Sequence, residues 1–136
     1  MSFGPSGALQ AAVYGVLSGD VALAAIVGGA VHDEPPVGPV AGTWVSLGEG
    51  EVRDVSDQSG GLGEHRFTVT VVTDDEGFAS AKAAAAAVAD ALDGATPAMS
   101  RGRIVAMGFV RARVRRVRAA QMRRIDMTFR AIVEDD

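Results

Sequence analysis

Histidine is the side chain that most often acts as a general base near neutral pH, and the sequence contains two, His32 and His65. Nucleophilic catalysis needs a nucleophile, a base within hydrogen-bond reach and a group that orients the base. The chain has no cysteine, and neither histidine stands in a motif that supplies such a set. His65 opens a strand-like segment, where a turn-capping or surface role is expected. We therefore expect no enzyme activity and assign no catalytic residue.

Two short patterns could suggest a ligand site. His32, Asp33 and Glu34 are consecutive, but neighbouring residues of an extended chain point to opposite faces and could not close around one ion. The glycine-rich stretch 60–63 lacks the lysine and hydroxyl of a phosphate-binding loop, and it precedes a strand-like segment instead of a helix. We expect neither a metal nor a cofactor.

Charge is distributed very unevenly along the chain. The net charge is −4, but residues 1–100 hold thirteen acidic and three basic side chains, whereas residues 101–130 hold ten arginines and one aspartate. The last three residues are acidic. Such a dipolar subunit can pair its basic region with the acidic region of an identical neighbour.

Arginine dominates the basic region, since the chain has a single lysine. Arginine is favoured where partly buried, bidentate pairing with carboxylate or phosphate is needed. A solvated face, a protein interface and a nucleic-acid contact remain open, and the protein interface is favoured. The residues we expect at a subunit interface are Arg111, Arg113, Arg115, Arg116, Arg118, Arg123 and Arg124.

The hydrophobic periodicity predicts three helices. Apolar residues recur at helical spacing over 6–18, and Asp20 is placed to cap a short second helix over 21–27. An alanine-rich helix is expected over 76–92, capped by Thr73 or Asp74. The proline segment 34–39 is expected to form an extended loop. The longest apolar stretches are far shorter than the ~20 residues of a bilayer span, so no membrane partner and no signal peptide are expected.

Alternating apolar residues predict strands over 43–48, 51–57, 65–73, 103–118 and 121–134. The last two form a long antiparallel hairpin, in which the adjacent Arg115 and Arg116 break the alternation and indicate a β-bulge. The predicted fold is a single α+β domain, 1–136. It has short N-terminal helices, an antiparallel sheet of about four strands, a long helix on one face, and the C-terminal hairpin.

The order of these elements resembles the tail-completion, or tail-terminator, family of long-tailed phages and gene transfer agents. The resemblance runs nearly end to end. It rests on Ile26-Val27-Gly28-Gly29, on the strand beginning Trp44-Val45-Ser46, on the Ala81-Lys82 and Ala91-Leu92 pairs, and above all on the segment Gly63-Glu64-His65-Arg66-Phe67-Thr68-Val69-Thr70-Val71. Val72 departs from the pattern, where tryptophan is more usual.

The resemblance implies a structural virion protein of the tail and neck, assembled in the bacterial cytoplasm. Its members form a ring, typically a hexamer, that ends the tail tube. The implied partners are other copies of the chain, the major tail tube protein, the head-closure protein, and genomic DNA that passes through the channel without specific binding. A head-closure (stopper) subunit and, less favoured, a basic-hairpin nucleic-acid-binding domain are the alternatives.

Two loops are candidates to order on docking to the tube or head partners. They comprise Pro35 and Pro36 of the proline segment and the linker Gln58, Ser59, Gly60, Gly61, Leu62 and Gly63.

Overall fold

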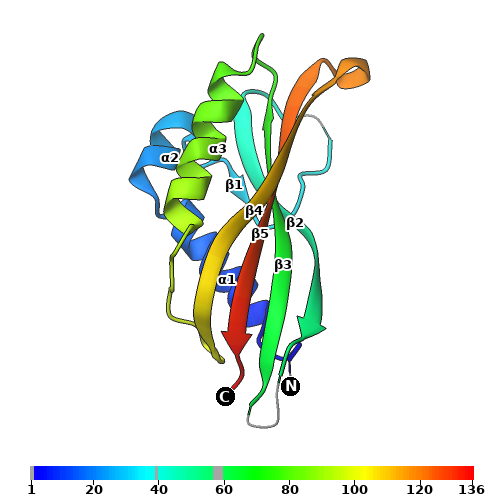
Figure 1. Ribbon diagram of the computed structural model, residues 1–136. Helices are drawn as coiled ribbons and strands as arrows, with labels where there is room; N and C mark the ends of the chain where they lie inside the picture. Colours follow the sequence, from blue (N-terminus) through cyan, green and yellow to red (C-terminus); the bar gives the residue numbers. More distant parts are fainter. Residues whose placement is uncertain (1, 39, 57–59) are drawn as a thin grey trace.

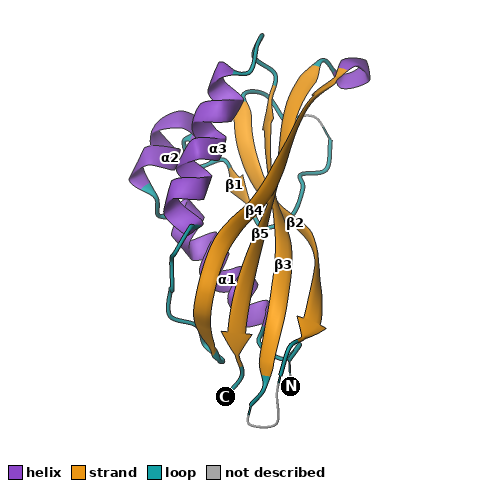
Figure 2. Cartoon of the chain, viewed as in Figure 1, coloured by secondary structure: helices purple, strands orange, loops and turns teal. Residues whose placement is uncertain are grey.

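The computed structural model describes residues 2–38, 40–56 and 60–136. Five strands form one sheet in the order β1-β2-β3-β5-β4. Three helices lie on one face of this strongly twisted sheet, and the two ends of the chain lie at the same end of the molecule (Figures 1 and 2). The fold is therefore α+β, as the sequence predicts, with one short strand more than the expected four.

The two N-terminal helices begin and end where the sequence indicates. Helix α1 spans Ser6–Ser18 and α2 spans Val21–Val27. The Asp20 carboxylate caps α2 by accepting a hydrogen bond from the Leu23 N–H at 2.9 Å. Gly28 follows with φ of 63°, a conformation that glycine adopts without steric cost. Leu9, Val13 and Leu17 bury one side of α1 in the core.

The first strands differ from expectation in length. The two-residue β1, Val31–His32, pairs in parallel with β2 and is too short to leave a periodic signal. Strand β2 is continuous over Thr43–Asp54 instead of being two separate strands, because a bulge between Leu47 and Gly50 absorbs the break in alternation. Strand β3 spans Leu62–Thr73, so it begins inside the expected linker.

Helix α3 spans Ala79–Leu92 and starts three residues later than predicted. Thr73 and Asp74 do not cap it. The Thr73 hydroxyl bonds to the Thr43 hydroxyl at 2.8 Å and accepts from the Asp75 N–H at 3.2 Å, and Gly77 has φ of 77°, which ends any earlier helical turn. The alanine-rich face of α3 is buried and contacts strands β2 to β5.

The C-terminal strands form the predicted hairpin, with β4 over Arg103–Val117 and β5 over Met122–Glu134. They are joined by a 3₁₀ turn at Arg118–Ala120 and by Gln121, whose φ is 53°. The inner face of β5 is buried as expected, through Ile125, Met127, Phe129, Ala131 and Val133.

The predicted bulge at Arg115 and Arg116 is wrong. Arg115 pairs with Arg124 and Arg116 with Arg123 in unbroken register. The bulges of β4 lie instead between Ile104 and Ala106 and between Phe109 and Arg111. Two adjacent arginines are tolerated without a bulge because this part of β4 is exposed on both faces, so neither side chain has to enter a core.

The outer face of the sheet, opposite the helices, is partly covered near β1. Trp44 and Val72 are paired across β2 and β3 and lie outside the core cluster under the helices, yet they are only 8% and 2% exposed. The proline segment passes over this side (Figure 1). Trp44 and Val72 thus form a small second apolar layer, with the His32 ring against Trp44, which alternation alone does not predict.

Within the described residues, no single helix is long and apolar enough to cross a membrane. The α1–α2 pair passes the length and composition test only when taken together, and it is bent by 72°.

Candidate interaction surface

The C-terminal hairpin extends beyond the helices that cover the rest of the sheet (Figure 1). The turn after α3 contacts β4 only at its middle, where Gly94 N–H donates to the Met107 carbonyl at 2.8 Å and Phe109 N–H donates to Asp93 Oδ1 at 3.2 Å. From residue 110 to residue 117, β4 has no described neighbour on its outer edge. We call the stretch 110–117 the free half of β4.

Apolar side chains are exposed on this free half. Val110 and Val114 are 37% and 45% exposed, and Ala112 is exposed as well. The nearby Phe109 is 45% exposed although one edge of its ring contacts Phe129, with centroids 5.8 Å apart. The alternation of apolar residues and arginines in this part of β4 therefore does not mark a buried face.

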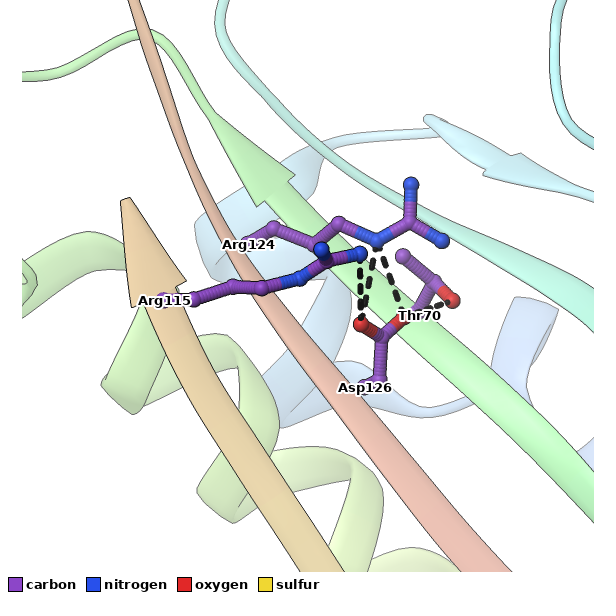
Figure 3. A network of polar contacts seen from close by, with 4 residues as sticks. All are labelled: Thr70, Arg115, Arg124 and Asp126. Carbon is purple, nitrogen blue, oxygen red and sulfur yellow. Dashed lines mark hydrogen bonds and ion pairs between the residues drawn. The ribbon is translucent and has the colours of Figure 1, made fainter. Parts of the chain in front are cut away.

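Three of the seven candidate arginines are held within the chain. Arg124 Nε donates to Asp126 Oδ1 at 2.9 Å, and Arg115 lies 3.5 Å from the other oxygen of the same carboxylate (Figure 3). Arg123 donates to the Asp75 carbonyl at 2.8 Å and stacks over the Phe78 ring, 5.5 Å from its centroid. These contacts hold the half of the hairpin nearest its turn.

The other four arginines are exposed and have no ion pair or side-chain hydrogen bond with any described residue: Arg111, Arg113, Arg116 and Arg118. The register places Arg111 and Arg113 opposite Thr128 and Asp126, so both point to the outer face of the sheet. They line a groove of about 600 Å³ that also includes Pro35 and Glu49. The structure thus brings Arg111 and Arg113 together on one surface.

A second arginine cluster on the outer face was not found from the sequence. The Glu64 carboxylate accepts from Arg130 at 2.6 Å and Arg66 at 3.1 Å, and Arg53 lies 3.5 Å away. Hydrogen bonds from Arg130 and then Arg66 lower the pKa of Glu64 below its usual range. The four residues come from three neighbouring strands, and the available signal was that Glu64 is the one acidic residue of β3.

The acidic C-terminus is neutralised within the chain. Arg101 binds Asp135 through two hydrogen bonds of 2.8 and 2.9 Å, and Arg103 donates to Glu134 at 2.8 Å. The hydrogen bond from Arg101 is the main cause that lowers the pKa of Asp135. Neither Arg101 nor Arg103 belongs to the unpaired arginines of the hairpin.

The residues of the two candidate docking loops lie in different kinds of structure. Pro35 and Pro36 lie in the segment over the outer face, and Pro35 lines the groove. Gly60 and Gly61 lie in a loop, but Leu62 and Gly63 belong to β3, so assigning them to the loop was wrong. Gln58 and Ser59 lie outside the described residues.

His65 is buried, not a surface or turn-capping residue as expected. It is 2% exposed, and its Nε2 lies 3.0 Å from the Ser2 carbonyl. Burial lowers its pKa. It borders a cleft of about 290 Å³ between the start of α1 and the edge of β2, lined by Phe3, Leu9, Val13, Val52 and their neighbours. No described side chain beside His65 forms a nucleophile–base pair with it.

No group of three or more histidine, aspartate or glutamate side chains gathers as metal ligands within the described part of the chain. His32 lies in β1 with its ring edge against Trp44, at a centroid distance of 5.9 Å. Asp33 instead accepts a hydrogen bond from Gln10 at 3.1 Å.

Comparison with known proteins agrees with the observed fold. Residues 11–134 match the model of the family described as "Tail completion protein gp17". Among solved structures, the chain is similar to one from "Virion of native gene transfer agent (GTA) particle". The two are 58% identical, with a TM-score of 0.90, over 98% of this chain and 99% of that one. A search of curated proteins found no match.

The family resemblance predicted from the sequence is confirmed, as is the expectation of a structural protein without enzyme activity. The matched region includes all five strands and α3, so the likeness extends well beyond the hairpin. The chain belongs to the tail completion protein gp17 family, as a structural component of the tail or neck of a phage-like particle.

Proposed function

We propose that this protein forms a ring, with six copies as the expected number, that terminates the tail tube and joins the tail to the head-closure complex. Membership of a tail completion family and 58% identity to a chain from a gene transfer agent virion support this role. The observation that carries the proposal is that likeness over nearly the full length of both chains. A protein that joins two assemblies needs several unlike contact surfaces on one small subunit.

The charge distribution supports ring formation. A ring is a closed, heterologous assembly in which one surface of each copy binds a different surface of the next. The unpaired Arg111 and Arg113 form a basic surface on the outer face, while acidic side chains predominate in residues 1–100. One subunit thus carries both halves of a complementary pair.

The major tail tube protein and the head-closure protein are the partners we assign to the two sides of the ring. The proline segment beside the groove is the described candidate for docking one of them. Genomic DNA passes through the channel without specific binding, because several phosphate contacts on each copy would multiply around a ring and hold the DNA.

Electron microscopy of particles made without this protein tests the proposal. Free heads beside tails of uncontrolled length are expected, because nothing would stop tube growth. Tails of normal length beside heads that have lost their DNA would assign the protein to head closure instead. Intact, infectious particles would refute a role in the tail or neck.

The unpaired arginines also favour one alternative, a nucleic-acid-binding hairpin. The isolated protein would then shift labelled duplex DNA at low salt, and the affinity would fall steeply as salt rises, since bound cations are released from the phosphates. We expect no shift at low salt from the free subunit.

A further inference from the structure

At each edge of the sheet, a long strand has a hydrogen-bonded neighbour over only part of its length. At one edge, β1 pairs with Val45 and Ser46 of β2, and beyond the bulge the stretch 48–54 has no described neighbour on that side. We call the stretch 48–54 the free half of β2. At the other edge the turn after α3 contacts β4 near Met107 and Phe109. Unpaired main-chain groups on an edge strand are a template for pairing with another chain.

The two free halves carry opposite charges on the outer face of the sheet. Glu49 and Glu51 of β2 are exposed and have no ion pair or hydrogen bond with any described residue. Glu51 is paired with Arg66 in register, and Glu49 lines the groove on the outer face. Arg111 and Arg113 lie on the same face of β4, equally without a partner.

The two free halves also match on the inner, helix-covered face. Ala112 and Val114 of β4, which pair with the buried Met127 and Ile125, are exposed there. Beside the free half of β2 lies the cleft of about 290 Å³, whose lining includes Phe3 and Val52. The exposed apolar strip of β4 and the apolar side chains that line this cleft would both lose contact with water if the two edges met. Exposed apolar surface of this kind marks an interaction site.

We propose that the free half of β4 in one copy pairs, strand to strand, with the free half of β2 in the next copy. Arg111 and Arg113 then face Glu49 and Glu51 on the outer side, and the apolar strip packs beside the cleft on the inner side. The inference rests on the proposed ring and assigns its subunit contact.

Strand direction agrees with a cyclic arrangement. Three successive antiparallel pairings, β2 with β3, β3 with β5 and β5 with β4, make β2 and β4 run in opposite directions within one copy. Rotation about a ring axis preserves the axial sense of each strand, so β4 meets the neighbour's β2 antiparallel. Antiparallel pairs form the more stable ladder.

The register sets the stagger between neighbours. Within one copy, Glu51 is level with Gly108, through Arg66 and Arg130. Because a bulge separates Phe109 from Arg111, Arg111 and Arg113 are level with Thr128 and Asp126, two and four positions from Arg130 along β5. This offset is roughly 7–13 Å at about 3.3 Å per residue. Strands that are inclined to the axis of a closed assembly produce a stagger of this kind between neighbours.

Engineered disulfides in assembled particles test the contact, since the natural chain has no cysteine. A chain with Arg113→Cys and Glu51→Cys replaces the natural one, and purified particles are oxidised and run without reductant. A ladder of linked subunits is expected. Each single variant, and Arg113→Cys combined with Asp90→Cys on the exposed side of α3, should stay monomeric. Particles that assemble normally but yield no ladder would refute this contact while leaving the ring itself standing.

A charge swap covers the case in which cysteine variants do not assemble. Arg111→Glu with Arg113→Glu should lower the particle yield at least tenfold, without shifting the melting temperature of the free subunit. Adding Glu49→Arg and Glu51→Arg to the same chain should restore the yield. Failure to restore it with a folded subunit would overturn the edge pairing. A full particle yield from the variant with Arg111→Glu and Arg113→Glu alone would also overturn the edge pairing. Neither result tests the ring itself, which is tested by the particles made without this protein.

Discussion

Asp126 binds side chains of β3, β4 and β5 in the half of the hairpin nearest its turn, and replacing it with alanine should destabilise the fold. Its carboxylate accepts a hydrogen bond from the Thr70 hydroxyl at 2.9 Å, binds Arg124 at 2.9 Å and lies 3.5 Å from Arg115 (Figure 3). Thr70 is only 4% exposed. The substitution therefore removes both the ion pairs and the acceptor of a buried hydroxyl.

The two losses differ in size. The Arg115 and Arg124 side chains are 44% and 39% exposed, so water screens their pairs and each contributes about 0.2–1 kcal/mol. A buried hydroxyl left without its acceptor costs about 1–3 kcal/mol. We expect Asp126→Ala to lower the free energy of unfolding by about 2–3 kcal/mol. For a chain of this length this is roughly a 10 °C fall in melting temperature.

Urea unfolding followed by the emission of Trp44, the one tryptophan of the chain, measures this loss. Asp126→Asn is the matched control, because its amide oxygen can still accept from Thr70 and only the charge is lost. It should cost under about 1 kcal/mol. In a protein that already carries Thr70→Val, no buried hydroxyl loses its acceptor. Asp126→Ala should then lower the free energy of unfolding by about the same small amount as Asp126→Asn does. Equal losses for the alanine and asparagine variants, or a loss below about 0.5 kcal/mol for alanine, would refute the argument.

Other substitutions separate docking from stability. Arg113→Ala should leave the melting temperature unchanged but reduce particle yield, whereas Arg124→Ala should lower stability by up to about 1 kcal/mol; equal thermal shifts would contradict the division into free and held arginines. Gly50→Ala should cost about 2 kcal/mol or more, because its Cβ would lie 2.3 Å from a main-chain oxygen of β3, whereas Gly48→Ala, with 3.6 Å of space, should cost less in the same urea titration. Because burial lowers the pKa of His65, the unfolded chain binds the proton first as pH falls below about 6.5. Stability should therefore decrease from about pH 7 downward, and His65→Gln should flatten this slope; an unchanged slope in the variant would show that other groups cause it.

Helical spacing, a capping residue and strand alternation correctly predicted the elements whose ends are set by neighbouring residues in the sequence. The spacing of Leu9, Val13 and Leu17 sets the face of α1, and Asp20 caps α2 through its own side chain. The alternation over β5 gives its buried face because β5 is central and covered along its length. Boundaries that depend on distant partners were missed, as with β1 and with the late start of α3 after Gly77.

The candidate surface was predicted in residue type but not in arrangement. Alternation shows that β4 has two faces, but it does not show where the helices stop covering one of them, so the exposure of Val110 and Val114 could not be predicted. Likewise, whether an arginine is free depends on acids far along the chain. Arg115 lies eleven residues from Asp126 in sequence, and Arg113 lies nearly as close in sequence but remains unpaired. Register alone does not make that distinction, since Arg113 lies directly opposite Asp126 while the carboxylate binds Arg124 and Arg115.

Cryo-electron microscopy of intact particles at side-chain resolution tests the central claim most directly. The proposal predicts a closed ring of this chain between the last ring of the tail tube and the head-closure protein. In each copy, β4 should lie antiparallel to the neighbour's β2, with Arg111 and Arg113 beside Glu49 and Glu51. A ring held through other surfaces would contradict the edge pairing. A junction that lacks this chain would contradict the proposed function itself.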